Sequence, residues 1–161
     1  MDIVTRDFPL RAPFSITGYT FHTQHVVWVV LRDGPHEGRG EASGVYYLGD
    51  TQDSMVTQLQ GVKASVEDGA TRPDIQKLLP PGGARHALDC AMWDLECKQQ
   101  GVRIWDLLGL TPHELTTVAT IGIGNAEHMA QRAVEYRDFS KLKVKLDADA
   151  PLAKLRAIRE A

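Results

Sequence analysis

Residues 141–146 read Lys-Leu-Lys-Val-Lys-Leu, an alternation of charged and apolar residues with a period of two. Side chains two positions apart share one face of a β-strand. The pattern therefore predicts a strand with Leu142, Val144 and Leu146 packed under a covering layer. The three ammonium groups would lie together on the opposite face, which makes that face a candidate functional surface.

The sequence before this strand repeats the succession of strand and helix. Residues 117–121, Thr-Val-Ala-Thr-Ile, predict a strand, and Asn125 is a suitable N-cap for a helix that runs to about Tyr136. Strand, helix, strand, helix predicts parallel pairing with right-handed crossovers. The chain from about residue 112 onward is therefore predicted to be of the α/β class.

A last helix is predicted after the lysine-bearing strand. Asp149 or Ala150 would cap it, and Pro151 stands in its first turn, where proline is tolerated. Its buried stripe is predicted to comprise Leu152, Leu155 and Ile158. Because two parallel strands need more strands beside them and cover on both faces, the chain reads as the front part of a longer protein.

The first 111 residues predict an α+β unit. The run 26–31, Val-Val-Trp-Val-Val-Leu, predicts a strand, Asp33-Gly34 a turn, and residues 38–42 the return strand of a hairpin. Residues 15–22, rich in turn formers and aromatics, fit either a mobile loop or an extended hairpin. A second irregular tract, residues 43–49, also carries aromatic residues, so the two tracts suggest the rim of a binding site.

Helices are predicted after the second irregular tract. The first follows Asp50-Thr51 and carries Met55, Leu59 and Val62 on one face. A short helix begins at Pro73 and carries Ile75, Leu78 and Leu79. A long helix runs from about Ala84 to Gln100. Gly101 is its expected C-terminal stop. A short amphipathic turn follows at residues 104–109.

Composition excludes several classes of function. A chain of 161 residues with 43% apolar content can bury one proper core. A net charge of −3 gives no basic field, so we expect no nucleic acid and no membrane as partner, and a cytoplasmic location. Cys90 and Cys97 lie two helical turns apart, about 10 Å, which predicts free thiols and no disulfide.

Two weaker motifs have simpler explanations. Gly122-Ile123-Gly124 follows a strand and opens a helix, as in a dinucleotide-binding fingerprint, but Glu127 stands where the third glycine belongs. A tight strand-to-helix turn is the favoured interpretation. His22 and His25 have the spacing of metal ligands but no third ligand nearby in sequence, so a solvated or substrate-facing role is favoured.

Lysines on a strand face have two interpretations. On an edge strand, lysine guards against aggregation. A strand flanked on both sides in a (β/α) barrel instead turns this face to the interior, which opens at the C-terminal ends of the strands, where active sites form. Neighbouring ammonium groups lower each other's pKa, and an amine so tuned can act as a base.

The same residues resemble a known family. Residues 84–96, followed by Gly101 and Leu107-Leu108-Gly109, are similar to the signature helix of the muconate-lactonizing branch of the enolase superfamily. Pro13-Phe14 with residues 38–42 resembles the hairpin of its capping domain, and Lys143-Val144-Lys145 resembles its K-x-K motif. Within this branch, the chain looks most similar to dipeptide epimerases of the L-Ala-D/L-Glu type.

The resemblance implies a fold and a chemistry. It implies an enolase-like capping domain over residues 1–111, then the first two βα units of a modified TIM barrel, truncated, over residues 112–161. The implied enzyme is an isomerase that removes and returns the proton α to a carboxylate, through an enediolate, with Mg²⁺ as cofactor. It implies a small-molecule substrate, a dipeptide, and a homo-oligomeric assembly.

The resemblance also implies roles for residues. Lys145 would be the catalytic base, and Lys143 its electrostatic partner. Thr120 matches a threonine that contacts substrate. The aromatic loops, residues 15–25 and 43–49, match two capping loops that shape specificity, and their substrate-binding candidates are Tyr19, Phe21, Tyr46 and Tyr47.

Two departures from the family pattern leave alternatives open. The three acidic Mg²⁺ ligands and a second catalytic lysine belong to later strands, so we expect this chain alone to be inactive, with no metal site of its own. Residues 15–25 contain no Arg or Lys to bind a glutamate side chain, so the substrate is open. The alternatives are an N-acylamino acid racemase, o-succinylbenzoate synthase or cycloisomerase, or a non-catalytic binding module if the native chain ends at residue 161.

Overall fold

The computed structural model describes residues 1–161 and divides into two compact units. Unit 1 comprises residues 1–8 and 24–112, and unit 2 comprises residues 9–23 and 113–161. Residues 9–23, which we call the hairpin tip, thus belong to unit 2 although they precede most of unit 1 in sequence. The predicted domains, residues 1–111 and 112–161, divide the chain differently at this hairpin and stay a prediction.

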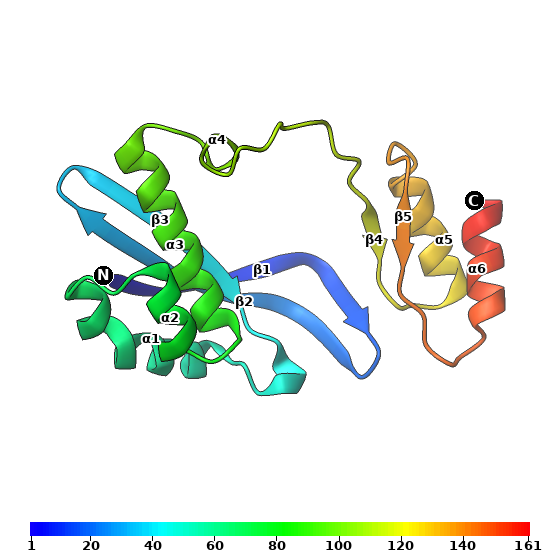
Figure 1. Cartoon of the computed structure of the whole chain (residues 1–161). Coiled ribbons are helices and arrows are strands. Elements are labelled where there is room, and N and C mark those ends of the chain that lie inside the picture. Colours follow the sequence, from blue (N-terminus) through cyan, green and yellow to red (C-terminus); the bar gives the residue numbers. More distant parts are fainter. The chain divides into compact units, whose positions relative to one another are not determined.

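A three-stranded sheet in the order β1-β2-β3 opens the chain (Figure 1). Its strands are β1 (Asp2–Ile16), β2 (Tyr19–Asp33) and β3 (His36–Ser43). Strands β2 and β3 pair antiparallel, with Val27 opposite Ala42 and Val29 opposite Gly40. Of the two interpretations of residues 15–22, the structure shows the extended hairpin, which turns at Gly18 with φ of 78°.

The helices of unit 1 begin and end at residues that the sequence marks. They are the 3-10 helix η1 (Tyr46–Leu48), and α1 (Gln52–Glu67), α2 (Arg72–Leu78), α3 (Gly83–Gln100) and α4 (Ile104–Leu107). Thr51 caps α1 in a reciprocal capping box with Ser54. Gly101 ends α3 in the left-handed conformation, as predicted.

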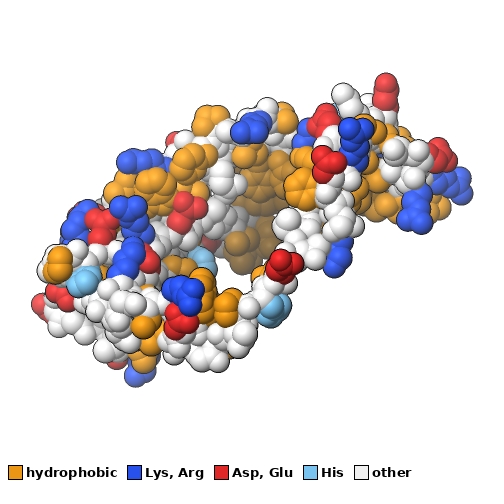
Figure 2. All heavy atoms as spheres, turned by 90° about the horizontal axis from the view of Figure 1, so that it is seen from above, with side chains coloured by type: hydrophobic (Ala, Val, Ile, Leu, Met, Phe, Trp, Pro, Cys, Tyr) orange, Lys and Arg blue, Asp and Glu red, His pale blue; other side chains and the backbone are white.

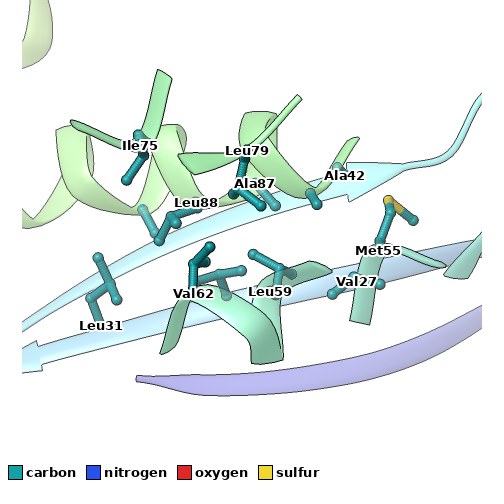
Figure 3. Close-up of a cluster of buried hydrophobic side chains, with 13 residues drawn as sticks. Val27, Leu31, Ala42, Met55, Leu59, Val62, Ile75, Leu79, Ala87 and Leu88 are labelled. Carbon is teal, nitrogen blue, oxygen red and sulfur yellow. The ribbon is translucent and has the colours of Figure 1, made fainter. Parts of the chain in front are cut away.

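The core of unit 1 lies between the sheet and its helices (Figure 3). Side chains from β2 and β3 meet side chains from α1, α2 and α3: Val27, Leu31, Ala42, Met55, Leu59, Val62, Ile75, Leu79, Ala87 and Leu88. The predicted stripe of α1 is confirmed, because Met55, Leu59 and Val62 are all buried. Leu78 of α2 is instead 44% exposed, so only Ile75 and Leu79 of that predicted set face the core.

Two glycines bring α3 into direct contact with the backbone of β3. A Cβ atom on Gly40 would lie 1.9 Å from the carbonyl oxygen of Ala87, and one on Gly38 would lie 2.2 Å from that of Ala91. Neither position can hold a side chain, because real atoms do not approach so closely. The Gly-x-Gly pair of β3 therefore serves helix–sheet packing.

Unit 2 contains a two-stranded parallel sheet and two helices. Strands β4 (Ala119–Ile121) and β5 (Leu142–Val144) alternate with α5 (Ala126–Glu135) and α6 (Pro151–Glu160). The predicted succession and parallel pairing are confirmed, although both strands are shorter than predicted because each pairs only with the other. Asn125 caps α5 by accepting a hydrogen bond from the His128 N–H, as predicted.

The apolar cluster of unit 2 corrects the prediction for α6. Ile121, Met129 and Ala133 are buried, and Val144, Leu146 and Ile158 pack against them. Leu152 and Leu155 are 69% and 39% exposed, so their predicted burial is wrong. The helix instead turns inward the stripe that carries Lys154 and Ile158, because Lys154 finds carboxylate partners on that side.

Leu142 is also more exposed than predicted, at 37%. It opens a strand of three residues, and the apolar cluster gathers around the later residues Val144 and Leu146. The covered face of the lysine-bearing strand is thus made by these two side chains alone.

The surface mixes charges of both signs. On the face that Figure 2 presents, Lys and Arg side chains alternate with Asp and Glu, and hydrophobic side chains lie between them. No helix combines the length and the apolar character needed to cross a membrane. Cys90 and Cys97 are free thiols, as predicted, and burial raises the pKa of Cys90.

Candidate active site

The lysine face of unit 2 is built on two neighbouring strands. Thr120 of β4 stands opposite Lys143 of β5 in the parallel register, so the two side chains share one face of the sheet. The backbone N–H of Lys145 donates to the carbonyl of Ile121 at 2.9 Å, which continues the pairing past the end of β5. By the period of two, Lys145 follows Lys143 on this face at the C-terminal end of the strand. We call these three residues the lysine face.

The hairpin tip lies against the C-terminal ends of both strands. The N–H of Ile123, just after β4, donates to the Ser15 carbonyl at 2.9 Å. The Thr17 hydroxyl donates to the carbonyl of Leu146, the residue after Lys145, at 3.4 Å. Since parallel strands of a barrel place their active site at this edge, the hairpin covers the edge where chemistry is expected.

Three aromatic rings gather in the hairpin tip. Tyr19 and Phe21 meet edge to face with ring centroids 4.7 Å apart, and Phe21 lies 6.2 Å from Phe14. Ser15 and Thr20 hydroxyls bond to each other at 2.9 Å across the turn. Two of the predicted substrate-binding residues, Tyr19 and Phe21, thus lie in the compact unit that holds both catalytic lysine candidates.

The glycines after β4 serve this same contact. A Cβ atom on Gly122 would lie 3.2 Å from the Phe14 ring and from the Ser15 backbone, so Gly122 leaves room for the hairpin. The N–H that a bound pyrophosphate would use, on Ile123, is already taken by Ser15. The favoured interpretation of Gly122-Ile123-Gly124 as a tight turn agrees with this packing.

Sequence reasoning missed the residue with the strongest electrostatic contacts in unit 2. Lys154 of α6 is 4% exposed and is the buried charged residue of the chain. Its Nζ donates to Asp147 Oδ1 at 2.7 Å and lies 3.3 Å from Asp149 Oδ2. The hydrogen bond from Lys154 lowers the pKa of Asp147, and the same bond raises the pKa of Lys154. Two acids just before a helix with a lysine in its second turn were the available signal.

Lys143 and Lys145 differ from Lys154 in having no carboxylate partner. The ion pairs of the β5–α6 region all converge on Lys154. Lys143 is exposed and Lys145 is half-buried. An amine without a carboxylate partner is the form of lysine suited to accept a proton, because an adjacent carboxylate would favour the protonated form.

Tyr46 and Tyr47, the remaining predicted substrate contacts, belong to unit 1. They lie in η1, where their rings meet edge to face with centroids 5.2 Å apart, and Tyr47 is 72% exposed. The loop that carries them is anchored at its end, because Asp50 Oδ2 accepts a hydrogen bond from the Gly83 N–H at 2.8 Å. Asp50 thereby caps the N-terminus of α3 from a distant part of the chain.

Other polar candidates from the sequence have structural partners. His25 pairs with Asp7 at 2.7 Å and its hydrogen bond lowers the pKa of that carboxyl. Asp94 of α3 accepts the Arg39 N–H at 2.8 Å and pairs with Lys98 at 2.7 Å. The first pair links β1 to β2, and the hydrogen bond of Asp94 links β3 to α3 within unit 1.

A Mg²⁺ site was tested against the residues present. No group of three His, Cys, Asp or Glu side chains lies close enough to hold a metal ion. The side chains of residues 1–161 therefore do not fit a Mg²⁺ centre. The chemistry of the lysine face is accordingly argued from protein groups alone.

Comparison with known proteins places this fold in a family. Residues 1–109 match the N-terminal domain of the mandelate racemase/muconate lactonizing enzyme family, and the chain belongs to that family. The resemblance to the muconate-lactonizing branch of the enolase superfamily is therefore confirmed, as is the α+β fold of its capping domain.

The relatives are racemases and epimerases. The chain is 37% identical to the L-Ala-D/L-Glu epimerase of Escherichia coli K12, over 96% of this chain and 49% of that protein. It is 32% identical to the N-acetyl-D-glutamate racemase of a Pseudoalteromonas species, over 84% of this chain and 44% of that protein. The chain thus spans about half the length of the curated relatives it matches.

A solved structure supports the same assignment. An enolase family member from Agrobacterium tumefaciens with homology to dipeptide epimerases, bound to sodium and L-Ala-L-Glu, superposes with a TM-score of 0.94. It is 32% identical, and the match covers 99% of this chain and 49% of that one. The similarity of fold therefore extends through both compact units.

Proposed function

We propose that this chain is the N-terminal part of a Mg²⁺-dependent dipeptide epimerase, an isomerase. In this proposal residues 1–111 form the capping domain and residues 112–161 the first two βα units of a barrel. The observation that carries it is the lysine face, whose C-terminal edge lies against the hairpin tip. The similarity to the L-Ala-D/L-Glu epimerase supports the choice of a dipeptide.

Lys145 is the proposed base. Its amine removes the proton α to the substrate carboxylate, and the charge that develops on the carboxylate is that of an enediolate. Lys143, two residues earlier on the same face, adds positive charge beside that anion and so stabilises it electrostatically. Reprotonation by Lys145 on the same face would restore the starting configuration. Inversion therefore needs an acid on the opposite face of the carbon, and the second catalytic lysine that the resemblance implies, outside residues 112–161, would supply that proton.

The other proposed contacts bind and shield the substrate. The Thr120 hydroxyl stands beside Lys143 and can donate to or accept from a polar group of the substrate. Tyr19 and Phe21 of the hairpin, with Tyr46 and Tyr47 of the second loop, are proposed to shape specificity. Mg²⁺ would stabilise the enediolate, and its ligands are proposed to lie outside residues 1–161.

Location and assembly belong to the same proposal. We propose a cytoplasmic homo-oligomer with a small-molecule substrate and no nucleic-acid or membrane partner. The mixed surface charge supports the absence of a nucleic-acid partner. The relatives act on small molecules by their names, which supports the substrate class.

An exchange experiment tests the function. The protein carrying these residues, at its full native length, is incubated in D₂O with Mg²⁺ and a panel of dipeptides, L-Ala-L-Glu and apolar L,L-dipeptides. We expect loss of the α-proton NMR signal of at least one dipeptide, with epimer formation. No exchange in any member of the panel would refute the proposal.

A racemase of N-acylated amino acids is the second candidate. The 32% identity to an N-acetyl-D-glutamate racemase favours it specifically, and such a reaction would use the same lysine. Adding N-acetyl-L- and N-acetyl-D-glutamate to the panel separates the two. Faster exchange with the N-acetyl amino acid than with every dipeptide would replace the first candidate by the second.

A further inference from the structure

The buried lysine of α6 has no explanation in fold stability alone. Taking an ammonium group out of water is costly, and a buried ion pair is often replaced by apolar residues without loss of stability. Yet α6 buries Lys154 at 4% exposure while two leucines of the same helix, Leu152 and Leu155, stay exposed. The position of this lysine must therefore serve something other than packing.

The partner of Lys154 occupies a sensitive position. Asp147 lies two residues after Lys145, so the alternation of the strand would carry its carboxylate to the lysine face if the strand continued. The chain bends there instead, and the Asp147 carboxylate meets Lys154 Nζ at 2.7 Å. The Asp147 side chain also accepts the Asp149 N–H at 3.2 Å, which fixes the loop into α6.

No other carboxylate competes for the end of β5. Neighbouring segments bond to this end of β5 through the Ile121 carbonyl and the Thr17 hydroxyl, and the hairpin tip carries Arg11, Tyr19 and His22 as its titratable groups. On α5, Arg132 pairs with Glu135, and Glu127 and His128 stand near its N-terminus. The Asp149 side chain is 86% exposed and also forms an ion pair with Lys154. Asp147 is thus the acid along the chain nearest to Lys145.

We propose that Lys154 is a positioning residue that holds the Asp147 carboxylate on the helix side of β5 and so keeps the Lys145 amine without an anionic partner. This inference rests on the proposed function in taking Lys145 as the base. If Asp147 were released, its carboxylate would meet Lys145 and hold that amine in the protonated form, in which it cannot remove a proton.

The test is the pH profile of proton exchange in three variants. In Lys154→Met, a side chain of similar length without charge, we expect the rising limb of kcat/KM to move upward by about 1 pH unit, which is about tenfold slower exchange below the limb. In the double variant Lys154→Met/Asp147→Asn, the limb returns to the wild-type pH because the carboxylate two residues after Lys145 is no longer present. In Lys154→Arg, which retains a cation, the limb stays at the wild-type pH.

A merely structural role gives a different pattern. If Lys154 only stabilised the loop, Lys154→Met would lower kcat with the limb in place, and Asp147→Asn would not restore it. That pattern overturns the inference. If Lys154→Met fails to fold by circular dichroism, Lys154→Leu takes its place, because it also removes every donor to Asp147, and an unmoved limb in that variant overturns the inference equally.

A second readout separates this inference from the proposed function. The Cε resonance of Lys145, assigned by its loss in Lys145→Arg, is titrated by NMR in wild type, Lys154→Met and the double variant. A midpoint that rises in the single variant and returns in the double variant supports the inference even if no substrate exchanges. An active enzyme whose Lys145 midpoint does not respond to Lys154→Met refutes it while leaving the epimerase proposal intact.

Discussion

The two compact units bury their apolar side chains to different extents. Unit 1 closes its sheet with three helices, and residues such as Val27, Leu59 and Leu88 have no exposed surface. Unit 2 has a small apolar cluster on one side of two short strands and keeps lysines on the other. The difference indicates that unit 1 is built for close packing, whereas unit 2 gives up burial in order to present charged groups at strand ends.

Replacing the proposed base tests whether unit 2 presents its lysines for catalysis. In Lys145→Ala we expect α-proton exchange to fall by about a thousandfold, because a positioned general base contributes about 10²–10⁴-fold. The unfolding midpoint should stay near that of wild type, because Lys145 makes no ion pair. Lys141→Ala is the matched control on the same strand, exposed and outside the proposed machinery. Equal losses in the two variants would contradict the role of Lys145.

Adding a side chain at the contact between β3 and α3 tests whether unit 1 depends on close packing. Gly40→Ala puts a Cβ atom 1.9 Å from the Ala87 carbonyl oxygen, so the helix must move, and we expect a loss of about 3 kcal/mol in the free energy of unfolding. Gly61→Ala in α1 is the control, since nothing lies within 4 Å of its Cβ, and we expect a gain of about 0.5–1 kcal/mol. Urea denaturation measures both, and a Gly40→Ala variant as stable as wild type would refute the packing argument.

The anchor of the second aromatic loop should give a smaller effect. Asp50→Ala removes the acceptor for the Gly83 N–H, and we expect a loss of about 1 kcal/mol, as for other helix N-caps. Asp50→Asn keeps a side-chain oxygen and is expected to lose less. Thermal melts of the two variants measure the difference. A lower melting temperature for Asp50→Asn than for Asp50→Ala would count against the capping role.

The smallest expected effect is the pH dependence of unit 2. The pKa of Asp147 is lowered in the folded state, so its contribution to stability is complete above its ordinary value of about 3.9 and is lost as pH falls through the lowered value. The pKa of Lys154 is raised, so its contribution is complete below about 10.4 and lost as pH rises through the raised value. Between pH 5 and pH 2, the melting temperature of the wild type should therefore fall by more than that of the double variant Lys154→Met/Asp147→Asn. Parallel curves for the two proteins would refute the linkage.

Local patterns were sufficient for most elements. The apolar run of residues 26–31 predicted a strand, and the spacing of Met55, Leu59 and Val62 predicted the buried face of α1, because a helix with one apolar face has one way to hide it. Gly101 and Asn125 marked helix ends correctly, since capping depends on residues adjacent in sequence. The class of the fold and the K-x-K strand were thus within reach of the sequence.

Contacts between segments distant in sequence could not be predicted from the sequence. Residues 15–22 fitted a loop and a hairpin equally well, and only the bonds of Ser15 and Thr17 to the ends of β4 and β5 show where the hairpin lies. The stripe of α6 was predicted wrongly because hydrophobicity favoured Leu152 and Leu155, whereas the pairing of Lys154 with Asp147 rotates the helix the other way.

The sequence by itself determined the succession of elements, the core of unit 1 and the pair of lysines on one strand face, because each follows from periodicity within a single segment. Only the tertiary structure decided that Asp147, the acid nearest to Lys145 in sequence, pairs with Lys154 of the next helix. An ion pair between a strand end and the next helix depends on the bend of the chain between them. Val144, Leu146 and Ile158 on either side of that bend pack on one apolar cluster, and the two acids and the lysine in residues 147–154 are a local signal that does not by itself show that they pair.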